Sequence, residues 1–531
     1  MIDPAATPLL SALATAARRD HAAFYAPGHK RGQGIGRSLA ALLGEQMFQA
    51  DLPELPELDN LFAPEGPIQQ AQQLAAVTFG ADDSFFLANG STCGIEAAVL
   101  AVCSPGEKVL VPRNVHRSVL SALILSGARP IFLSPASDTR WDLAYGMTPT
   151  SVAAALDQYP DIRVVVVVSP NYQGVCVDVS AICTIVHNHA GIVIVDEAHG
   201  PHLCFHDQLP LGALASGADL VIQSTHKVLS ALTQASMLHV QGQRVDRDRL
   251  RQALQLTQST SPNYLLLASL DAARQQMAVA GHALMDKTLH LARTVRSQLA
   301  RLTPLACLTP ETLAVTPGGF QLDLTRLTVD VAQLGMTGFA ADTLLHETLG
   351  VTAELPTLRQ LTFIISLGNT VADGSRLVTA LTTLVKGTLN RKLLAPIPLS
   401  SRETVAPETD SFPLVPRKTN AAVNNKVNSP SFPLPTQPQG IGWEVPLLTE
   451  PPFSPREAFF AKSRSVSIAQ AVGYICADTL CPYPPGIPIL LPGEVITNEV
   501  IRYLQQIRDA GGVITGNPDP DLETLRIVET D

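Results

Sequence analysis

The sequence has no hydrophobic run long enough to cross a membrane. Only 16% of its 531 residues are charged and 5% are aromatic, yet no stretch reaches the roughly 18 consecutive apolar residues that a spanning helix requires. The first ten residues include Asp3 and Pro4, where a secretory signal needs positive charge followed by an apolar segment. We therefore expect a soluble, cytoplasmic protein with no membrane partner.

Positive charge is also scarce, because 37 Lys and Arg residues face 47 Asp and Glu residues, for a net charge of −10. Such a balance argues against nucleic acid as a partner. Hydrophobic residues make up 46% of the chain, which is ample for large cores. The length is compatible with two or three domains.

Paired cysteine motifs are absent as well. The eight cysteines are scattered through apolar contexts, without the CxxC spacing of a zinc site or the density of a disulfide framework. We interpret them as reduced and mostly buried thiols, because free cysteine is among the most buried residue types. No metal site is predicted.

Between residues 80 and 230, short β-branched runs alternate with helical patterns, as in parallel sheets with crossover helices. The pure valine run at 164–168 suits a strand buried on both faces. The sequence therefore predicts an α/β fold with a mostly parallel sheet. The candidate strands are residues 84–87, 108–111, 130–133, 163–169, 191–196 and 219–223.

The composition changes at residues 401–440, which contain seven of the 41 prolines among many Ser, Thr and Asn residues. Such a stretch buries too little apolar surface to offset the entropy lost on ordering. We interpret it as a linker. Residues 441–531 then form a small separate α+β domain with a β-rich segment at 489–491 and a helical end.

The segment most informative about chemistry is Asp219-Leu-Val-Ile-Gln-Ser-Thr-His-Lys227, an apolar strand that ends in polar residues. A desolvated lysine at such a place has a lowered pKa and can form a Schiff base with an aldehyde cofactor. The alternative is a surface lysine at a strand end, so the neighbouring motifs must decide.

A second buried strand, Ile192-Val-Ile-Val, ends in Asp196-Glu-Ala-His-Gly200. Ligands of open α/β sheets gather at this edge, and a carboxylate there can pair with the protonated pyridine nitrogen of pyridoxal phosphate. Asp-Glu-Ala-His also occurs in helicases. That alternative requires a GxxxxGK[ST] phosphate loop, which the sequence lacks.

Two further motifs follow strands. In Ala88-Asn-Gly-Ser-Thr92, small hydroxyl residues precede a helical pattern, which is typical of a phosphate site at a helix N-terminus, although a plain N-cap is an alternative. In Arg113-Asn-Val-His116, the imidazole could lie flat on an aromatic ring, although it could also be a solvated turn histidine.

These motifs, in this order, resemble the Orn/Lys/Arg decarboxylase family of fold-type I pyridoxal phosphate enzymes. The resemblance extends to Ala26-Pro-Gly-His-Lys30, Ser224-Thr-His-Lys227 and Thr260-Ser-Pro-Asn-Tyr264, and to Ala477-Asp-Thr-Leu-Cys-Pro-Tyr-Pro-Pro-Gly-Ile-Pro488 and Leu491-Pro-Gly-Glu494 in the C-terminal domain. It runs from about Phe24 to about Glu499.

The resemblance implies a role for each matching residue. Lys227 binds the cofactor covalently, Asp196 contacts its pyridine nitrogen, and His116 stacks on the ring. The other implied cofactor contacts are Gly90, Ser91, Thr92, Ala198, His199, Ser224 and His226, with Ser259 or Thr260 reaching the phosphate of a neighbouring subunit. An active site at the interface of a homodimer, or of a dimer of dimers, would follow. A proton donor, Lys227 or His116, would complete the reaction.

Two departures from the family pattern concern the substrate and the assembly. Many relatives have Glu where this sequence has Asp478, a candidate partner for the distal cation of the substrate. Glu494 is a second candidate, and a structural role for both is an alternative. Larger bacterial members carry a receiver-like domain before the cofactor domain. Because Pro27-Gly-His29 comes so early here, we expect the short form.

We therefore expect five units: an N-terminal segment (1–60), a cofactor-binding major domain (61–300), a small α/β subdomain (301–400), the linker (401–440) and the C-terminal domain (441–531). The implied activity is pyridoxal 5'-phosphate-dependent decarboxylation of lysine, arginine or ornithine to cadaverine, agmatine or putrescine. An α-oxoamine synthase and a catalytically weak regulatory relative remain alternatives.

Overall fold

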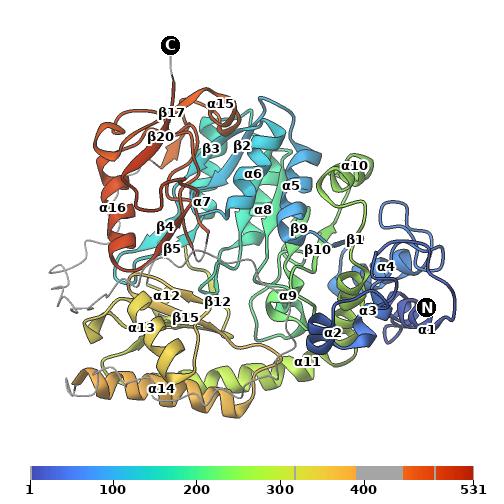
Figure 1. The fold of residues 1–531 in the computed structure, drawn as a ribbon. Coiled ribbons are helices and arrows are strands. Elements are labelled where there is room, and N and C mark those ends of the chain that lie inside the picture. Colours follow the sequence, from blue (N-terminus) through green and yellow to red (C-terminus); the bar gives the residue numbers. More distant parts are fainter. Residues whose placement is uncertain (1–2, 316–317, 390–446, 484–485, 530–531) are drawn as a thin grey trace, which may run out of the picture.

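A computed structural model describes residues 3–315, 318–389, 447–483 and 486–529. The expected linker at 401–440 lies outside these ranges. Within them, eight strands form the central sheet (Figure 1). From one edge to the other they are β1 (Asp83–Leu87), β10 (Ser236–Val240), β9 (Leu220–Gln223), β8 (Ile192–Asp196), β6 (Val164–Val168), β2 (Lys108–Pro112), β3 (Arg129–Leu133) and β16 (Leu448–Thr449).

The six strands expected from the sequence are all present, with ends within one residue of the expected positions. Strands β9, β8, β6, β2 and β3 are mutually parallel, whereas β10, β1 and β16 attach antiparallel. The sequence analysis did not identify β10, a fully buried Ser-Met-Leu-His-Val run with a single β-branched residue.

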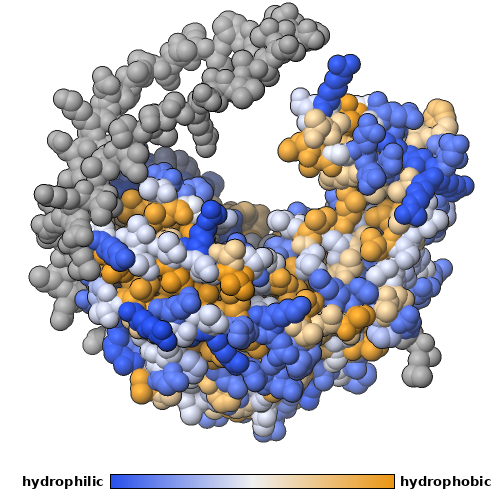
Figure 2. All heavy atoms as spheres, turned by 90° about the horizontal axis from the view of Figure 1, so that it is seen from below, coloured by the Kyte–Doolittle hydropathy of each residue, from blue (hydrophilic) through white to orange (hydrophobic). Residues whose placement is uncertain are grey.

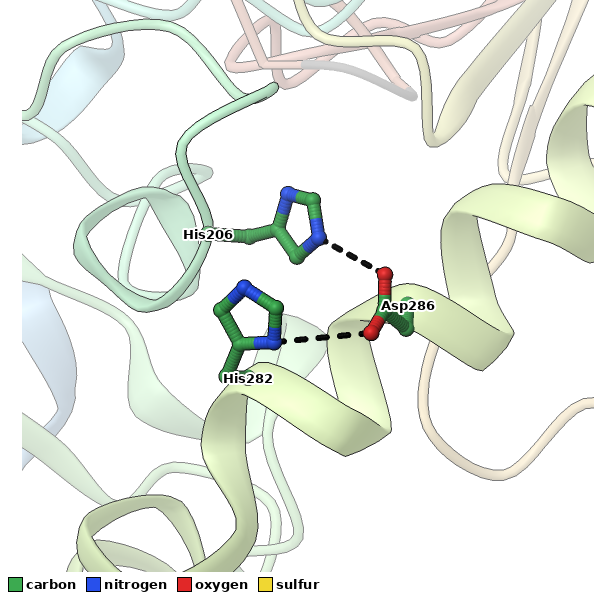
Figure 3. Close-up of side chains that lie close together, drawn as sticks. All are labelled: His206, His282 and Asp286. Atoms are coloured by element: carbon green, nitrogen blue, oxygen red, sulfur yellow. Dashed lines mark hydrogen bonds and ion pairs between the residues drawn. The ribbon is translucent and has the colours of Figure 1, made fainter.

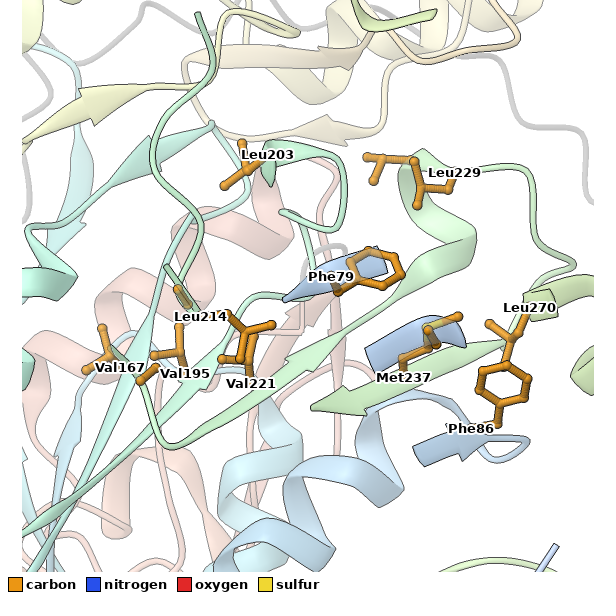
Figure 4. Packing of buried hydrophobic residues seen from close by; sticks show 14 of the residues in the cluster. Phe79, Phe86, Val167, Val195, Leu203, Leu214, Val221, Leu229, Met237 and Leu270 are labelled. Atoms are coloured by element: carbon orange, nitrogen blue, oxygen red, sulfur yellow. The ribbon is translucent and has the colours of Figure 1, made fainter. Parts of the chain in front are cut away.

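The valine run of β6 shows how the sheet is buried. Val165 and Val167 pack into the core on one face, while Val164 and Val166 pack into the core on the other. Such alternation is what a strand with helices on both faces requires. Figure 4 shows part of the first core, where Val167, Val195 and Val221 of neighbouring strands lie side by side.

Helices cover both faces of the sheet. One layer contains α5 (Gly90–Val102), α6 (Arg117–Ser126) and α10 (Arg247–Thr257). The other contains α1 (Pro8–Arg18), α4 (Pro67–Phe79), α7 (Pro149–Gln158), α8 (Val179–Asn188) and α11 (Tyr264–Leu299). The expected N-terminal segment thus contributes α1 to the main core, where Asp271 of α11 accepts hydrogen bonds from the Leu9 and Leu10 N–H groups.

Helix α11 continues into a smaller unit with its own core. Its sheet is antiparallel, in the order β11 (Ala306–Cys307), β13 (Arg326–Asp330), β15 (Gln360–Ile364) and β14 (Leu355–Pro356), and α13 (Gly338–Leu344) and α14 (Val371–Leu389) accompany it. Shorter elements complete the N-terminal segment, the major unit and the small unit: α2 (Arg37–Leu43), α3 (Glu45–Ala50), β4 (Ala136–Asp138), β5 (Leu143–Gly146), β7 (Val175–Cys176), η1 (Leu203–Phe205), α9 (Thr225–Val228), α12 (Pro310–Leu313), β12 (Gln321–Leu322), η2 (Ala332–Leu334) and η3 (Leu345–Leu349).

The C-terminal unit is α+β, as expected, but its details differ from the expectation. Residues 489–491 form no strand there, and the described chain ends on a strand rather than a helix, because β20 pairs with β17. The amphipathic pattern of α16 dominates this part of the sequence, whereas β20 is short. The elements are α15 (Pro455–Phe460), β17 (Ser463–Ser467), η4 (Ile468–Gln470), β18 (Cys481–Tyr483), α16 (Asn498–Asp509), β19 (Val513–Thr515) and β20 (Thr524–Val528).

Strand pairing and core packing are among the contacts that join the C-terminal unit to the major unit. Strand β16 extends the central sheet by pairing Leu448 with Leu133 and Thr449 with Phe132, and Leu491 is buried in the core under α5 and α6. All eight cysteines are free, and six are buried, consistent with the expected thiols. Among the described helices, none has an apolar stretch that could span a bilayer.

Candidate active site

The candidate lysine lies where two parallel strands end side by side. Asp196 is the last residue of β8 and pairs in register with Ile222 of β9. One residue after β9, the chain turns into the single-turn helix α9, which carries Lys227. The topology therefore brings the two predicted groups together at the carboxyl edge of the sheet, as ligand sites of open α/β sheets require.

The Lys227 amine lies in a largely buried position. Its Nζ is 3.0 Å from Nε2 of His199 and 5.5 Å from the ring centroid of Tyr172. Burial lowers the pKa of Lys227, although the negative charges of Asp196 and Glu354 act in the opposite direction. The net shift is downward, so the uncharged, nucleophilic form of this amine is more accessible than that of a lysine in water.

The carboxylate and imidazole beside this amine are buried as well. Burial raises the pKa of Asp196, while nearby Lys227 and the Ala198 N–H group, which donates at 3.1 Å, lower it. Burial also lowers the pKa of His199 well below its usual value. The His199 ring lies 4.4 Å from that of Tyr172, centroid to centroid. His199 is therefore neutral near pH 7.

The predicted phosphate site lies at the start of α5. Asn89, the residue before this helix, does not cap it with its side chain; Asn89 Oδ1 instead accepts a hydrogen bond from the Ser259 N–H group at 3.3 Å. The Ser224 hydroxyl donates to Ser91 Oγ at 2.8 Å, so two hydroxyls from different elements meet at this helix end. Uncapped N–H groups with convergent hydroxyls form an anion site.

His116 is the residue before α6, and its Nδ1 accepts a hydrogen bond from the Ser118 N–H group at 3.2 Å. Burial, together with the positive charges of Lys227 and Arg117, lowers the pKa of His116 to about 4. His226 also has a lowered pKa, caused mainly by burial, and its Nδ1 lies 3.1 Å from the Ala235 carbonyl oxygen. Both rings are therefore neutral near pH 7.

A cavity of about 1150 Å³ joins these groups. All three units contribute to its walls, with Phe339 and Leu355 from the small unit and Thr497 and Tyr503 from the C-terminal unit. Six of the residues predicted to contact the cofactor line it: Ser91, His116, Asp196, Ala198, His199 and Lys227. A buried amine, a buried carboxylate and an uncapped helix N-terminus fit an aldehyde cofactor that carries a phosphate group.

Comparison with known proteins places this site in a family. The Orn/Lys/Arg decarboxylase major domain matches residues 7–373, and the C-terminal domain of the same family matches residues 447–517. The chain belongs to the Orn/Lys/Arg decarboxylase family. The chain is 36% identical to the arginine decarboxylase of Bacillus subtilis over 98% of both chains. It is 26% identical to a lysine decarboxylase of Pseudomonas aeruginosa, over 94% of this chain and 76% of that protein.

Solved structures agree on the fold. Lysine decarboxylase A from P. aeruginosa superposes with a TM-score of 0.81 at 24% identity, over 98% of this chain and 80% of that one. The lysine decarboxylase of Francisella novicida gives a TM-score of 0.79 at 22% identity, over 98% and 81%. The fold-type I class and the family predicted from the sequence are therefore confirmed, and the chain is a decarboxylase.

Other predicted contacts of this decarboxylase lie off the cavity wall. Ser259 and Thr260 are exposed, and the Ser259 N–H group donates to Asn89 of the same chain. Their contact with a neighbouring subunit stays a prediction. Gly90, with φ +79, begins α5, and Thr92 follows in its first turn.

The two candidate substrate carboxylates differ in position. Glu494 lies at the cavity wall, but the Arg113 Nε and Nη2 groups donate to its two oxygens at 2.9 and 2.8 Å. Arg113 also donates to the carbonyl oxygens of Pro488 and Ile489. Asp478 lies outside the lining and pairs with Arg526 at 3.3 Å. Within one chain, both therefore have structural partners, and their substrate role stays a prediction.

The sequence analysis missed Tyr172 and Arg326. Tyr172 follows β6, and the rule that polar residues after a buried strand face the site could have found it. Arg326 begins β13, about 100 residues after Lys227, and lies behind His199. No local pattern marks it, because its position depends on how the small unit packs against the major one.

A second polar cluster lies outside this cavity. His206 and Asp286 form a hydrogen bond at 2.9 Å, and His282 lies 3.4 Å from the same carboxylate (Figure 3). Nδ1 of His206 accepts the Gln208 N–H group at 3.1 Å, so Nε2 carries the proton that points to Asp286. A metal at Nε2 would need that proton on Nδ1, against another N–H group. We interpret the cluster as a structural contact that attaches the loop after η1 to α11.

Proposed function

We propose that this decarboxylase uses pyridoxal 5'-phosphate to remove the α-carboxyl group of a basic amino acid, with arginine as the preferred substrate. The observation that carries the cofactor assignment is the largely buried Lys227 amine at the strand edge, 3.0 Å from His199 Nε2 and influenced by the charge of Asp196. Arginine is supported by relatives named arginine decarboxylase at 35–37% identity, against 24–26% for those named lysine decarboxylase.

When bound, pyridoxal 5'-phosphate supplies an electron sink for the bond to the departing CO₂. The chain itself supplies the nucleophile at Lys227, the charge at Asp196 that favours a protonated ring nitrogen, and the anion site at the start of α5. His116 and Ala198, which both line the cavity, would lie beside the ring.

Lys227 is the better of the two predicted proton donors. His116 is neutral at pH 7 because its pKa is about 4, and its Nδ1 is an acceptor for the Ser118 N–H group. Once it has taken up a proton from the ammonium group of the incoming substrate, the Lys227 amine, beside Nε2 of His199, can pass a proton to the α-carbon after CO₂ leaves.

Replacing Lys227 by Ala tests the cofactor assignment. The variant should lose turnover of arginine, lysine and ornithine and the absorbance of the covalently held cofactor. Lys108→Ala is the matched control, because Lys108 pairs with Asp161 on the surface outside the cavity, and it should keep both. Turnover by Lys227→Ala above the uncatalysed rate would contradict the assignment.

We further propose that the chain acts as a homodimer. Large apolar side chains are exposed in the N-terminal segment, where Phe24 is 94% and Leu42 78% exposed, and Figure 2 shows further hydrophobic residues on the surface seen from below. A partner subunit could cover such side chains. Light scattering should give twice the 56.5 kDa chain mass or a multiple of that dimer, and Leu42→Asp should shift it toward the monomer; a wild-type monomer with full activity would contradict this.

A further inference from the structure

A buried arginine lies behind His199, close to the ring nitrogen that does not face Lys227. The side chain of Arg326 is fully buried. Its Nη2 donates to the His199 carbonyl oxygen at 2.9 Å and lies 3.5 Å from His199 Nδ1. Because Lys227 Nζ lies 3.0 Å from Nε2, the imidazole is held between two basic side chains.

The number of protons on this imidazole is then constrained. A neutral imidazole has one N–H group and one acceptor nitrogen, and a guanidinium can only donate. Arg326 therefore requires the lone pair on Nδ1, which leaves the proton on Nε2, facing Lys227. The Lys227 amine can accept a hydrogen bond from this N–H group only when the amine is uncharged and has a free lone pair.

We propose that Arg326 is a positioning residue, which fixes His199 as the Nε2–H tautomer and thereby holds Lys227 as an uncharged nucleophile. The inference rests on the proposed function only in taking Lys227 as the nucleophile. It assigns Arg326 no contact with substrate.

The surrounding fold is built to hold this arginine. Arg326 Nε lies 3.5 Å from Asp323, which also pairs with His202 at 3.0 Å. Gly174 has φ +86, and a Cβ there would lie 2.6 Å from Cγ of Arg326. Any other residue at position 174 would be strained and would displace the guanidinium.

The charges facing Lys227 determine in which direction the loss of Arg326 shifts the pKa of Lys227. Asp196 and Glu354 raise the pKa of Lys227, whereas burial and the Arg326 charge lower it. His116 and the Tyr172 ring also face the amine, and both are neutral near pH 7. Removing Arg326 leaves two carboxylates opposed by burial alone, so the amine should become uncharged only at higher pH.

The test measures Lys227 in the full-length apoenzyme, without cofactor or substrate. Acetic anhydride is the probe, and the acetylation rate of the Lys227 peptide is followed by mass spectrometry from pH 6 to 10. We expect Arg326→Met to shift the midpoint upward by about one pH unit or more, which slows labelling at pH 7 about tenfold. Gly174→Ala should reproduce the shift.

Arg359→Met is the matched control, because Arg359 pairs with Asp330 in the same small sheet, and it should leave the midpoint unchanged. An unchanged midpoint in Arg326→Met would overturn the proposal. So would a variant that only raises KM for the amino acid, since that result would make Arg326 a substrate contact. A shifted midpoint in Arg326→Met, together with no decarboxylation of arginine, lysine or ornithine by the wild-type holoenzyme, would count against the proposed function instead.

A measurement on the wild type does not depend on any variant folding. In apoenzyme labelled with [¹⁵N]histidine, with the His199 signals assigned from His199→Asn, the ¹⁵N shifts at pH 7 should place the proton on Nε2. A proton on Nδ1 would overturn the proposal.

Discussion

At the scale of single residues, burial rather than neighbouring charge governs protonation around the site. Loss of hydration is the largest cause of the lowered pKa of Lys227, His116 and His199 and of the raised pKa of Asp196. The site therefore holds His116 and His199 neutral near pH 7 and shifts the pKa of Lys227 downward, toward the uncharged amine.

The charge of Asp196 is the residue-scale feature most open to a direct test. Asp196→Asn keeps the size of the side chain and removes its negative charge, and we expect kcat to fall roughly 100- to 1000-fold, as when one group that stabilises a transition state is removed. Cofactor binding should persist through Lys227. Steady-state kinetics with arginine measure the loss, and a wild-type kcat would show that this carboxylate does not support the reaction.

The pairing of Arg113 with Glu494 leads to a different expectation. Both side chains are mostly buried, at 18% and 16% exposed, and join the major unit to the C-terminal unit. Removing one partner of such a pair costs about 3 kcal/mol or more. Glu494→Gln should therefore lower the midpoint of urea unfolding more than it changes KM. A large rise in KM at unchanged stability would instead make Glu494 a substrate contact.

At the scale of elements, a buried network of hydrogen bonds between side chains crosses four neighbouring strands. Glu197 accepts from the Gln223 amide at 2.7 Å, Gln223 Oε1 lies 3.1 Å from His239 Nε2, and His239 Nδ1 lies 2.7 Å from the Ser84 hydroxyl. This network of hydrogen bonds links β8, β9, β10 and β1. It gives Glu197 of the Asp-Glu-Ala-His motif a structural role that the motif alone did not reveal.

His239 should make stability depend on pH. Burial lowers its pKa from 6.5 to about 3, so the unfolded chain binds this proton first as pH falls. The stabilisation is complete above pH 6.5 and is lost between pH 6.5 and 3, by about 2 kcal/mol at pH 5. Urea unfolding of the wild type and of His239→Gln at pH 7 and pH 5 measures how much His239 contributes to the change in the free energy of unfolding.

The comparison between variants is needed because other groups also titrate in this range. Burial raises the pKa of Glu197 to about 7. This shift makes the folded state more stable as the pH falls below 7, which opposes the effect of His239. Exposed His346→Gln is the matched control and should keep the wild-type pH dependence. An equal loss between pH 7 and 5 in wild type and His239→Gln would contradict the account of His239.

Local patterns predicted the elements of the major unit well. Most of the parallel strands contain several buried β-branched residues, and polar residues at the ends of two of them reveal Lys227 and Asp196. By contrast, β10 and the C-terminal strand β20 lack a β-branched run long enough to be recognised. Arg326 could not be found, since its contact with His199 depends on packing between units far apart in sequence.

At the scale of the whole molecule, three units close one cavity, and the C-terminal unit is fastened by strand pairing, a buried leucine and an ion pair. A protease site inserted within 401–440 tests that attachment. After cleavage, the two fragments should co-elute in size-exclusion chromatography and keep activity. Separation of intact fragments would show that the contacts of β16 and Arg113 do not hold the units together.

A competition assay shows whether this chain decarboxylates arginine in preference to other basic amino acids. Purified protein with added pyridoxal 5'-phosphate receives equimolar arginine, lysine and ornithine, and the amines and CO₂ are quantified by mass spectrometry. We expect one dominant amine, agmatine, released with equimolar CO₂. No amine from any of the three, with the cofactor held by Lys227, would contradict this expectation.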